Sequence, residues 1–148
     1  MDVTAGLAFL LEGHALVPGD AAGQLLVASE PLSFWGGYDA DTGEIIDRRH
    51  TLSGSNASGR VLAIPSTRGS STTSAVLLEA IRAGKAPAAI LTSEVDVFLA
   101  LASIVADEMY RTPLPVVALR PDDFSRLRSG VRATVERSGR VRVGGGPV

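Results

Sequence analysis

Between residues 60 and 119 the sequence alternates short apolar runs with longer amphipathic stretches. Three runs are each short enough to be a buried strand: RVLAIP at 60–65, AAIL at 88–91 and LPVVAL at 114–119. In the stretch between the first two, apolar residues recur at the three- and four-residue spacing of a buried helix face: Val76, Leu77, Ala80 and Ile81. Gly84 supplies a C-terminal stop for that helix, and residues 97–110 give a second amphipathic helix. This β-α-β-α-β order predicts a parallel sheet in an α/β fold.

Outside this region the patterns are shorter. They predict strands in a hairpin or meander at 7–11, 15–17 and 24–28, a short helix at 121–124, and a closing hairpin at 132–144 about Ser138 and Gly139. Residues 29–60 are irregular, and so long a loop in a compact domain is usually functional or covered by something else. The 148 residues suit one domain. We therefore expect a single domain over 1–148, with a β-rich N-terminal half packed against the α/β half.

Composition excludes several classes of function. The net charge is -2 and no segment concentrates lysine or arginine, so we expect no nucleic-acid partner. The chain has no cysteine, which excludes disulfides and any thiolate-held zinc ion or iron–sulfur cluster on this chain alone. No stretch approaches the roughly 20 apolar residues of a membrane span, and no basic leader begins the chain. We expect a cytoplasmic protein without membrane contact.

Hydroxyl residues crowd the junction between the first expected strand and the first expected helix, in PSTRGSSTTS at 65–74. Ligands of open α/β sheets bind beyond the carboxyl ends of strands, and the N-terminus of a helix offers free N–H groups that favour an anion. Arg68 adds a planar fork of donors that can grip a carboxylate. Gly69 lets the backbone approach a ligand closely. Together they suit a small carboxylic acid.

The same hydroxyl residues also suit a purely structural role. Serine and threonine are favoured N-cap residues, worth about 1 kcal/mol each, and one of Ser70, Ser71 or Thr72 is expected to cap the helix. The local pattern leaves open whether the cluster also binds a ligand, and it does not say which serine reacts. Other motifs give no guidance, because the chain lacks a G-x-S-x-G elbow and a P-loop. His14 and His50 are not spaced as metal ligands.

Three long blocks resemble the aconitase X small subunit, the swivelling domain of that family: EPLSFWGGYDADTGEIIDRRH at 30–50, GRVLAIPSTRGSSTTSAVLLEAIRAGKAPAAIL at 59–91, and DVFLALASIVADEMYRTPLPVV at 96–117. The resemblance implies a swivelling β/β/α domain, similar to the mobile domain of aconitase, that closes over a cleft in a large catalytic subunit. It also implies that this aconitase X large subunit, the expected partner, holds an iron–sulfur cluster. The serine that the family uses as proton acceptor falls on Ser70, with Arg68 and Gly69 just before it and Ser71 just after it as substrate-binding residues.

The reaction that the resemblance implies is dehydration of a β-hydroxy carboxylic acid by a two-subunit hydro-lyase. Ser70 would remove the proton α to the carboxylate, while the cluster iron of the partner would take the departing hydroxyl. The arginine- and alanine-rich, lysine-poor composition and the SFWGG stretch are similar to bacterial members that dehydrate cis-3-hydroxy-L-proline to 1-pyrroline-2-carboxylate. One alternative is the small subunit of phosphomevalonate dehydratase. Another is a non-catalytic interaction module. An exposed Phe34 and Trp35 in the irregular segment could contact a partner under any of these hypotheses, or could instead cover the local core.

Overall fold

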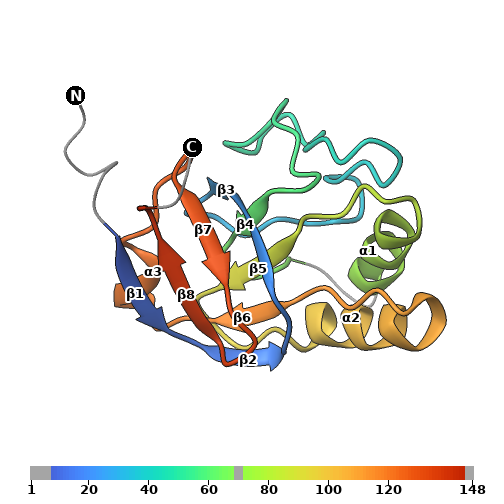
Figure 1. The fold of residues 1–148 in the computed structure, drawn as a ribbon. Helices are drawn as coiled ribbons and strands as arrows, with labels where there is room; N and C mark the ends of the chain where they lie inside the picture. Colours follow the sequence, from blue (N-terminus) through green and yellow to red (C-terminus); the bar gives the residue numbers. More distant parts are fainter. Residues whose placement is uncertain (1–7, 69–71, 146–148) are drawn as a thin grey trace.

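The computed structural model describes residues 8–68 and 72–145, and its elements follow the predicted order (Figure 1). They are β1 (Phe9–Glu12), β2 (His14–Val17), β3 (Ala21–Val27), β4 (Val61–Ala63), α1 (Thr72–Arg82), β5 (Ala89–Thr92), α2 (Val97–Tyr110), β6 (Val116–Ala118), α3 (Pro121–Phe124), β7 (Arg132–Val135) and β8 (Arg140–Val143). The β-α-β-α-β prediction for the region from β4 to β6 is confirmed, because β4 pairs in parallel with β5 and β5 with β6.

In the described residues the strands form an eight-stranded sheet in the order β1-β8-β7-β3-β4-β5-β6-β2. The long strand β3 joins its two halves. Residues 21–24 pair antiparallel with β7, while residues 25–27 pair in parallel with β4. The closing hairpin of β7 and β8 is confirmed. The result is an antiparallel layer, a mostly parallel layer, and α1 and α2 side by side on the outer face of the latter (Figure 1).

The predicted hairpin or meander of the first three strands is wrong, although the strands themselves are present. β1 pairs with β8 and β2 pairs with β6, at opposite ends of the strand order. Only Gly13 separates these two strands, and its N–H donates to the carbonyl of Gly139 at 3.0 Å. A Cβ at position 13 would lie 2.9 Å from that carbonyl oxygen. The chain therefore turns a tight corner at Gly13, which carries it from one layer to the other instead of back along itself.

The central strands of the parallel layer, β4 and β5, bury both of their faces, as helix-covered parallel sheets do. In β4, Leu62 faces the helices, whereas Val61 and Ala63 face the antiparallel layer. β5 repeats the alternation with Ile90 toward the helices and Leu91 away from them. The parallel layer thus has a hydrophobic core on each side: an outer core between the layer and the helices, which includes Leu62 and Ile90, and an inner core between the two layers, which includes Val61 and Leu91. Because both faces are covered, the strands of this layer appear in the sequence as continuous apolar runs. α1 completes the outer core with Leu77, Ala80 and Ile81, and Val76 packs at its margin.

Gly84 ends α1 as predicted. Its φ is +72°, its N–H donates to the carbonyl of Ile81 at 3.1 Å, and the N–H of Lys85 donates to the carbonyl of Ala80 at 2.8 Å. These two bonds form a Schellman motif, in which glycine adopts the left-handed conformation at little cost.

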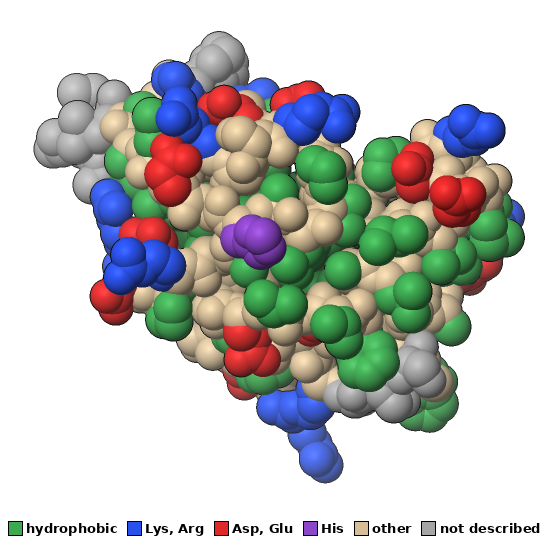
Figure 2. Space-filling model, turned by 90° about the horizontal axis from the view of Figure 1, so that it is seen from below, with side chains coloured by type: hydrophobic (Ala, Val, Ile, Leu, Met, Phe, Trp, Pro, Cys, Tyr) green, Lys and Arg blue, Asp and Glu red, His purple; other side chains and the backbone are tan. Residues whose placement is uncertain are grey.

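The outer face of α2 is apolar and exposed. Figure 2 shows the molecule from below the view of Figure 1, the side on which α2 lies. Hydrophobic side chains are spread over the right half of this face. The exposed large residues here are Val95, Val97, Leu101, Ile104 and Met109. Among the described helices, none is both long enough and apolar enough to cross a membrane.

The segment 29–60 is irregular but well packed. Its chain makes isolated bridges, such as the one between Tyr38 and Ile45, and buries side chains in the outer core. Phe34 is fully buried, with its ring centroid 5.1 Å from that of Tyr38, so the expectation that Phe34 is exposed is wrong and its core-covering alternative is right. The neighbouring Trp35 is 68% exposed. Phe34 is therefore part of the outer core, whereas Trp35 lies on the surface.

Candidate functional site

The backbone that follows β4 lies beside the start of the irregular segment. Leu32 forms a parallel bridge with Thr67. Its N–H donates to the carbonyl of Ser66 at 3.3 Å, and its own carbonyl accepts from the N–H of Arg68 at 3.0 Å. Because Leu32 is fully buried, this bridge fixes one side of the segment 66–68 to the core.

The other side of this segment is held by the N-terminus of α2. Asp96 is the N-cap of that helix, and its Oδ1 accepts from the N–H groups of Phe98 and Leu99. Its Oδ2 accepts from both the N–H and the Oγ1 of Thr67, at 2.7 Å and 2.6 Å. A single buried carboxylate thus caps the helix and binds the residue just before Arg68.

His50 holds the irregular segment on the side of the site that faces segment 66–68. Its Nδ1 accepts from the N–H of Leu52 at 3.1 Å, so the proton of the neutral ring lies on Nε2, which is 3.2 Å from the carbonyl oxygen of Pro31. Glu30 approaches the same Nε2 at 3.6 Å and accepts from the N–H of Thr51 at 3.0 Å. The imidazole is buried and has a structural role, which agrees with the absence of metal-ligand spacing in the sequence.

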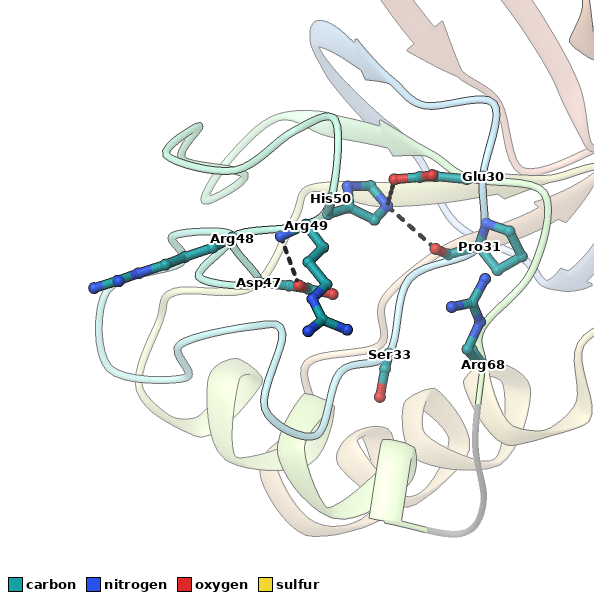
Figure 3. A pocket seen from close by; sticks show the side chains of 8 residues that line it. All are labelled: Glu30, Pro31, Ser33, Asp47, Arg48, Arg49, His50 and Arg68. Carbon is teal, nitrogen blue, oxygen red and sulfur yellow. Dashed lines mark hydrogen bonds and ion pairs between the residues drawn. The ribbon is translucent and has the colours of Figure 1, made fainter.

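Between these walls lies an open pocket of about 470 Å³. Its lining residues come from segment 30–50 and from the segment that follows β4: Glu30, Pro31, Ser33, Asp47, Arg48, Arg49, His50 and Arg68. Figure 3 shows Arg49 and Arg68 on opposite sides of the pocket, with Ser33 between them, while Arg48 points away from the other side chains. Both carboxylates of the lining already have partners, because Asp47 accepts from the N–H of Arg49 and Glu30 accepts from the N–H of Thr51. The guanidinium groups of Arg49 and Arg68 therefore favour an anionic ligand.

Arg68 is the cation best placed to bind such an anion. Its backbone is fixed by Leu32, its side chain is exposed at the pocket, and its guanidinium makes no hydrogen bond or ion pair with another of the described residues. Two parallel N–H donors therefore remain for a carboxylate. Gly69, Ser70 and Ser71, the other predicted site residues, lie outside the described residues. Their expected roles stay predictions.

Residues that the sequence reasoning did not single out make up most of this site. Asp96 carried a detectable signal, because an aspartate directly before an amphipathic run is a typical N-cap. Glu30, Asp47 and Arg49 carried no individual signal, because they belong to a segment without periodicity, although that segment as a whole was expected to be functional or covered.

The chain's own side chains do not fit an iron–sulfur cluster. Such clusters need thiolate ligands, at most partly replaced by histidine, and the sequence contains no cysteine. Among residues 8–68 and 72–145, no group of three or more histidine, aspartate or glutamate side chains could hold a metal ion either. Any cluster used with this pocket would have to be bound elsewhere.

Comparison with known proteins places this geometry in a family. The family described as the aconitase X swivel domain matches residues 10–143. Over 112 residues the chain is 54% identical to a cis-3-hydroxy-L-proline dehydratase of Pseudomonas aeruginosa, a match that covers 76% of this chain and 19% of that protein. A similar match, 44% identical over 116 residues, is to the cis-3-hydroxy-L-proline dehydratase of Hypocrea jecorina. The chain thus spans about a fifth of the length of these two relatives.

Shorter relatives match over most of their own length. The phosphomevalonate dehydratase small subunit of Thermococcus onnurineus is 37% identical over 126 residues, which are 85% of this chain and 91% of that subunit. The crystal structure of holo aconitase X from Thermococcus kodakaraensis superposes with a TM-score of 0.82 at 32% identity, covering 91% of this chain and 98% of that one. These likenesses confirm the predicted swivelling fold. The chain belongs to the aconitase X swivel domain family, whose relatives named here are dehydratases or their subunits.

Proposed function

We propose that this chain is the swivelling part of a hydro-lyase that dehydrates cis-3-hydroxy-L-proline to 1-pyrroline-2-carboxylate. The observation that carries the proposal is the 54% identity to a dehydratase of this substrate. A pocket where the guanidinium of Arg68 has no partner among the described residues supports it, because the substrate carries a carboxylate.

In this proposal Arg68 binds the substrate carboxylate through two parallel hydrogen bonds. Ser70, two residues further along, accepts the proton from the α-carbon. The Cα–H bond and the Cβ–O bond both break, so that water is lost and the resulting cyclic enamine tautomerises to the imine. A serine oxygen is a very weak base, and the cationic pocket together with the N-terminus of α1 would stabilise its anion.

The site would be completed by a large partner. The chain has no ligands of its own for an iron–sulfur cluster, and the dehydratases that it matches are about five times as long as the matching region. We infer that an aconitase X large subunit holds the cluster and closes over the pocket. The long relatives carry the matching region within a single polypeptide, whereas the Thermococcus relative is named a small subunit.

A second candidate is the small subunit of a phosphomevalonate dehydratase. It is favoured by the match that covers 91% of such a subunit, and the arginines of the pocket could hold a phosphate. The identity of 37% is lower than the 54% to the hydroxyproline enzyme, which is why we place it second.

The test is to coexpress the chain with a cysteine-bearing aconitase X large subunit and to assay both substrates with the purified, iron-loaded complex. We expect turnover of cis-3-hydroxy-L-proline and none of mevalonate 5-phosphate. The reverse preference would establish the second candidate. A complex that assembles with iron but turns over neither substrate would contradict both, and would favour a non-catalytic interaction module.

A further inference from the structure

Arg49 lies across the pocket from Arg68 (Figure 3). Like that of Arg68, its guanidinium makes no hydrogen bond or ion pair with another residue among 8–68 and 72–145. Arg48 is the remaining arginine of the lining, and its side chain points away from the others (Figure 3). Two cations that hold no anion of the described chain therefore flank one open space.

The two carboxylates of the lining do not neutralise Arg49. Oδ1 of Asp47 accepts from the backbone N–H of Arg49 at 3.0 Å, which is a local turn and not a contact with the guanidinium. Oε1 of Glu30 accepts from the N–H of Thr51 at 3.0 Å and lies 3.6 Å from Nε2 of His50. Within the described part of the chain, neither carboxylate forms an ion pair with an arginine of the pocket.

Both arginines project from backbone that is held in place. Arg49 stands between the turn at Asp47 and the buried His50, whose N–H donates to the carbonyl of Asp47 at 3.1 Å. The backbone N–H of Arg68 donates to the carbonyl of Leu32 at 3.0 Å. The separation of the two guanidinium groups can therefore change only through the rotamers of their own side chains.

The space between the two arginines can hold a small organic molecule. The side chain between them in Figure 3 is the small Ser33, whose Oγ donates to the carbonyl of Trp35 at 3.0 Å. The pocket volume of about 470 Å³ is in the range of small-molecule sites. A guanidinium binds a carboxylate or a phosphate through two parallel hydrogen bonds. One molecule with an anionic group at each end would therefore give both arginines a partner.

We propose that Arg49 forms a second anion subsite, so that a small molecule with a carboxylate on Arg68 and another anionic group on Arg49 bridges the pocket. The subsite depends only on the pocket, whereas its effect on catalysis rests on the function proposed above. Because cis-3-hydroxy-L-proline carries one carboxylate, it occupies Arg68 and leaves Arg49 without an anion. A bridging ligand takes Arg68 from this substrate and is a competitive inhibitor.

The length of the ligand provides a test of bridging. We would titrate the full chain by calorimetry at low salt, where charge interactions are little screened, with malonate, succinate, glutarate and adipate, and with the monocarboxylate butyrate. Two linked groups gain affinity only when the linker matches the span of their sites. We expect one dicarboxylate to bind about tenfold more tightly than butyrate and both shorter and longer ones to bind less well. Affinities that show no such optimum would overturn the proposal.

Three variants assign the optimum to particular arginines. Arg49→Ala and Arg68→Ala should each bring the best dicarboxylate to within about threefold of butyrate, because one anchor is lost. Arg48→Ala is the matched control, since it removes the same charge from the same lining, and it should retain the preference. All three side chains are exposed, so the melting temperatures should be equal. A preference that survives in Arg49→Ala, or that disappears equally in Arg48→Ala, would refute the subsite.

Inhibition of the iron-loaded complex tests the link to catalysis. The best dicarboxylate should raise KM for cis-3-hydroxy-L-proline and leave kcat unchanged, and Arg49→Ala should raise its inhibition constant about tenfold, the affinity that the second anchor contributes. Inhibition that is not competitive would contradict bridging to Arg68. If the chain binds the dicarboxylate with the expected optimum but the wild-type complex turns over neither substrate, the subsite stands and the proposed function fails.

Discussion

The Nε2 of His50 lies 3.2 Å from the carbonyl oxygen of Pro31, so that one buried imidazole joins two distant parts of the irregular segment 29–60. His50→Ala would remove the partner of the half-buried Pro31 carbonyl and leave the buried Leu52 N–H without an acceptor, and one unsatisfied buried group costs about 1–3 kcal/mol. We expect a loss of unfolding free energy of that order, measured by urea denaturation. The control is His14→Ala, because His14 is exposed on β2. Equal stabilities of the two variants would show that the imidazole does not hold the segment.

Arg68 should determine affinity for the substrate carboxylate. Removing a bidentate pair removes charge-assisted hydrogen bonds worth about 1.5–3 kcal/mol each. We therefore expect Arg68→Ala to lower kcat/KM at least tenfold in the complex, and Arg68→Lys to recover only part of it, because an ammonium cannot form the planar fork. Arg48 lines the same pocket but points away from it (Figure 3), so Arg48→Ala is the matched control. A similar loss in both variants would mean that general charge, and not Arg68, attracts the substrate.

Adjacent Phe34 and Trp35 should have opposite effects when truncated. Phe34 is fully buried, and Phe→Ala in a core typically costs 3–5 kcal/mol. Trp35 is 68% exposed, so Trp35→Ala should leave the stability of the isolated chain nearly unchanged. We expect Trp35→Ala instead to weaken binding of the large partner, as measured by titration calorimetry, because exposed tryptophans are frequent interface anchors. Unaltered partner affinity would remove Trp35 from the interface.

Tyr38 gives the protein a predictable loss of stability in alkali. Burial raises the pKa of its phenol well above the usual tyrosine value, and the hydroxyl donates to the carbonyl of Lys85 at 2.7 Å. The folded chain therefore keeps its proton at pH values where the unfolded chain loses it, so the free energy of unfolding should fall as pH rises above about 10. Tyr38→Phe cannot ionise, and its stability should fall less steeply over the same range. Parallel slopes for the two proteins would contradict this assignment.

Local features of the fold could be predicted because each depends on a few consecutive residues. The bounds of α2 and the end of α1 at Gly84 follow from apolar spacing and one glycine. The pairing of β1 with β8 could not be predicted, because it joins residues about 130 positions apart and depends on the corner at Gly13. Hydrophobic alternation shows that a segment is a strand but not which strand lies beside it.

Some residues of the candidate site could likewise be predicted from local sequence, and others could not. Arg68 was predictable because it follows a buried strand and precedes a helix, where ligands of α/β sheets bind. The opposing wall, with Glu30 and Arg49, lies in a segment whose shape depends on contacts such as the His50 bond. Asp96 is 29 residues from Thr67, so its cap could be read from the sequence but its second contact could not.

The central claim is that Ser70 of this chain accepts a proton in a reaction that a larger partner completes. It is tested most directly by turnover of cis-3-hydroxy-L-proline by the complex containing Ser70→Ala, compared with wild type at equal iron content and equal assembly. We predict that the wild-type complex forms 1-pyrroline-2-carboxylate and that the variant complex loses at least a thousandfold in kcat. A variant that assembles normally and retains wild-type turnover would contradict the account.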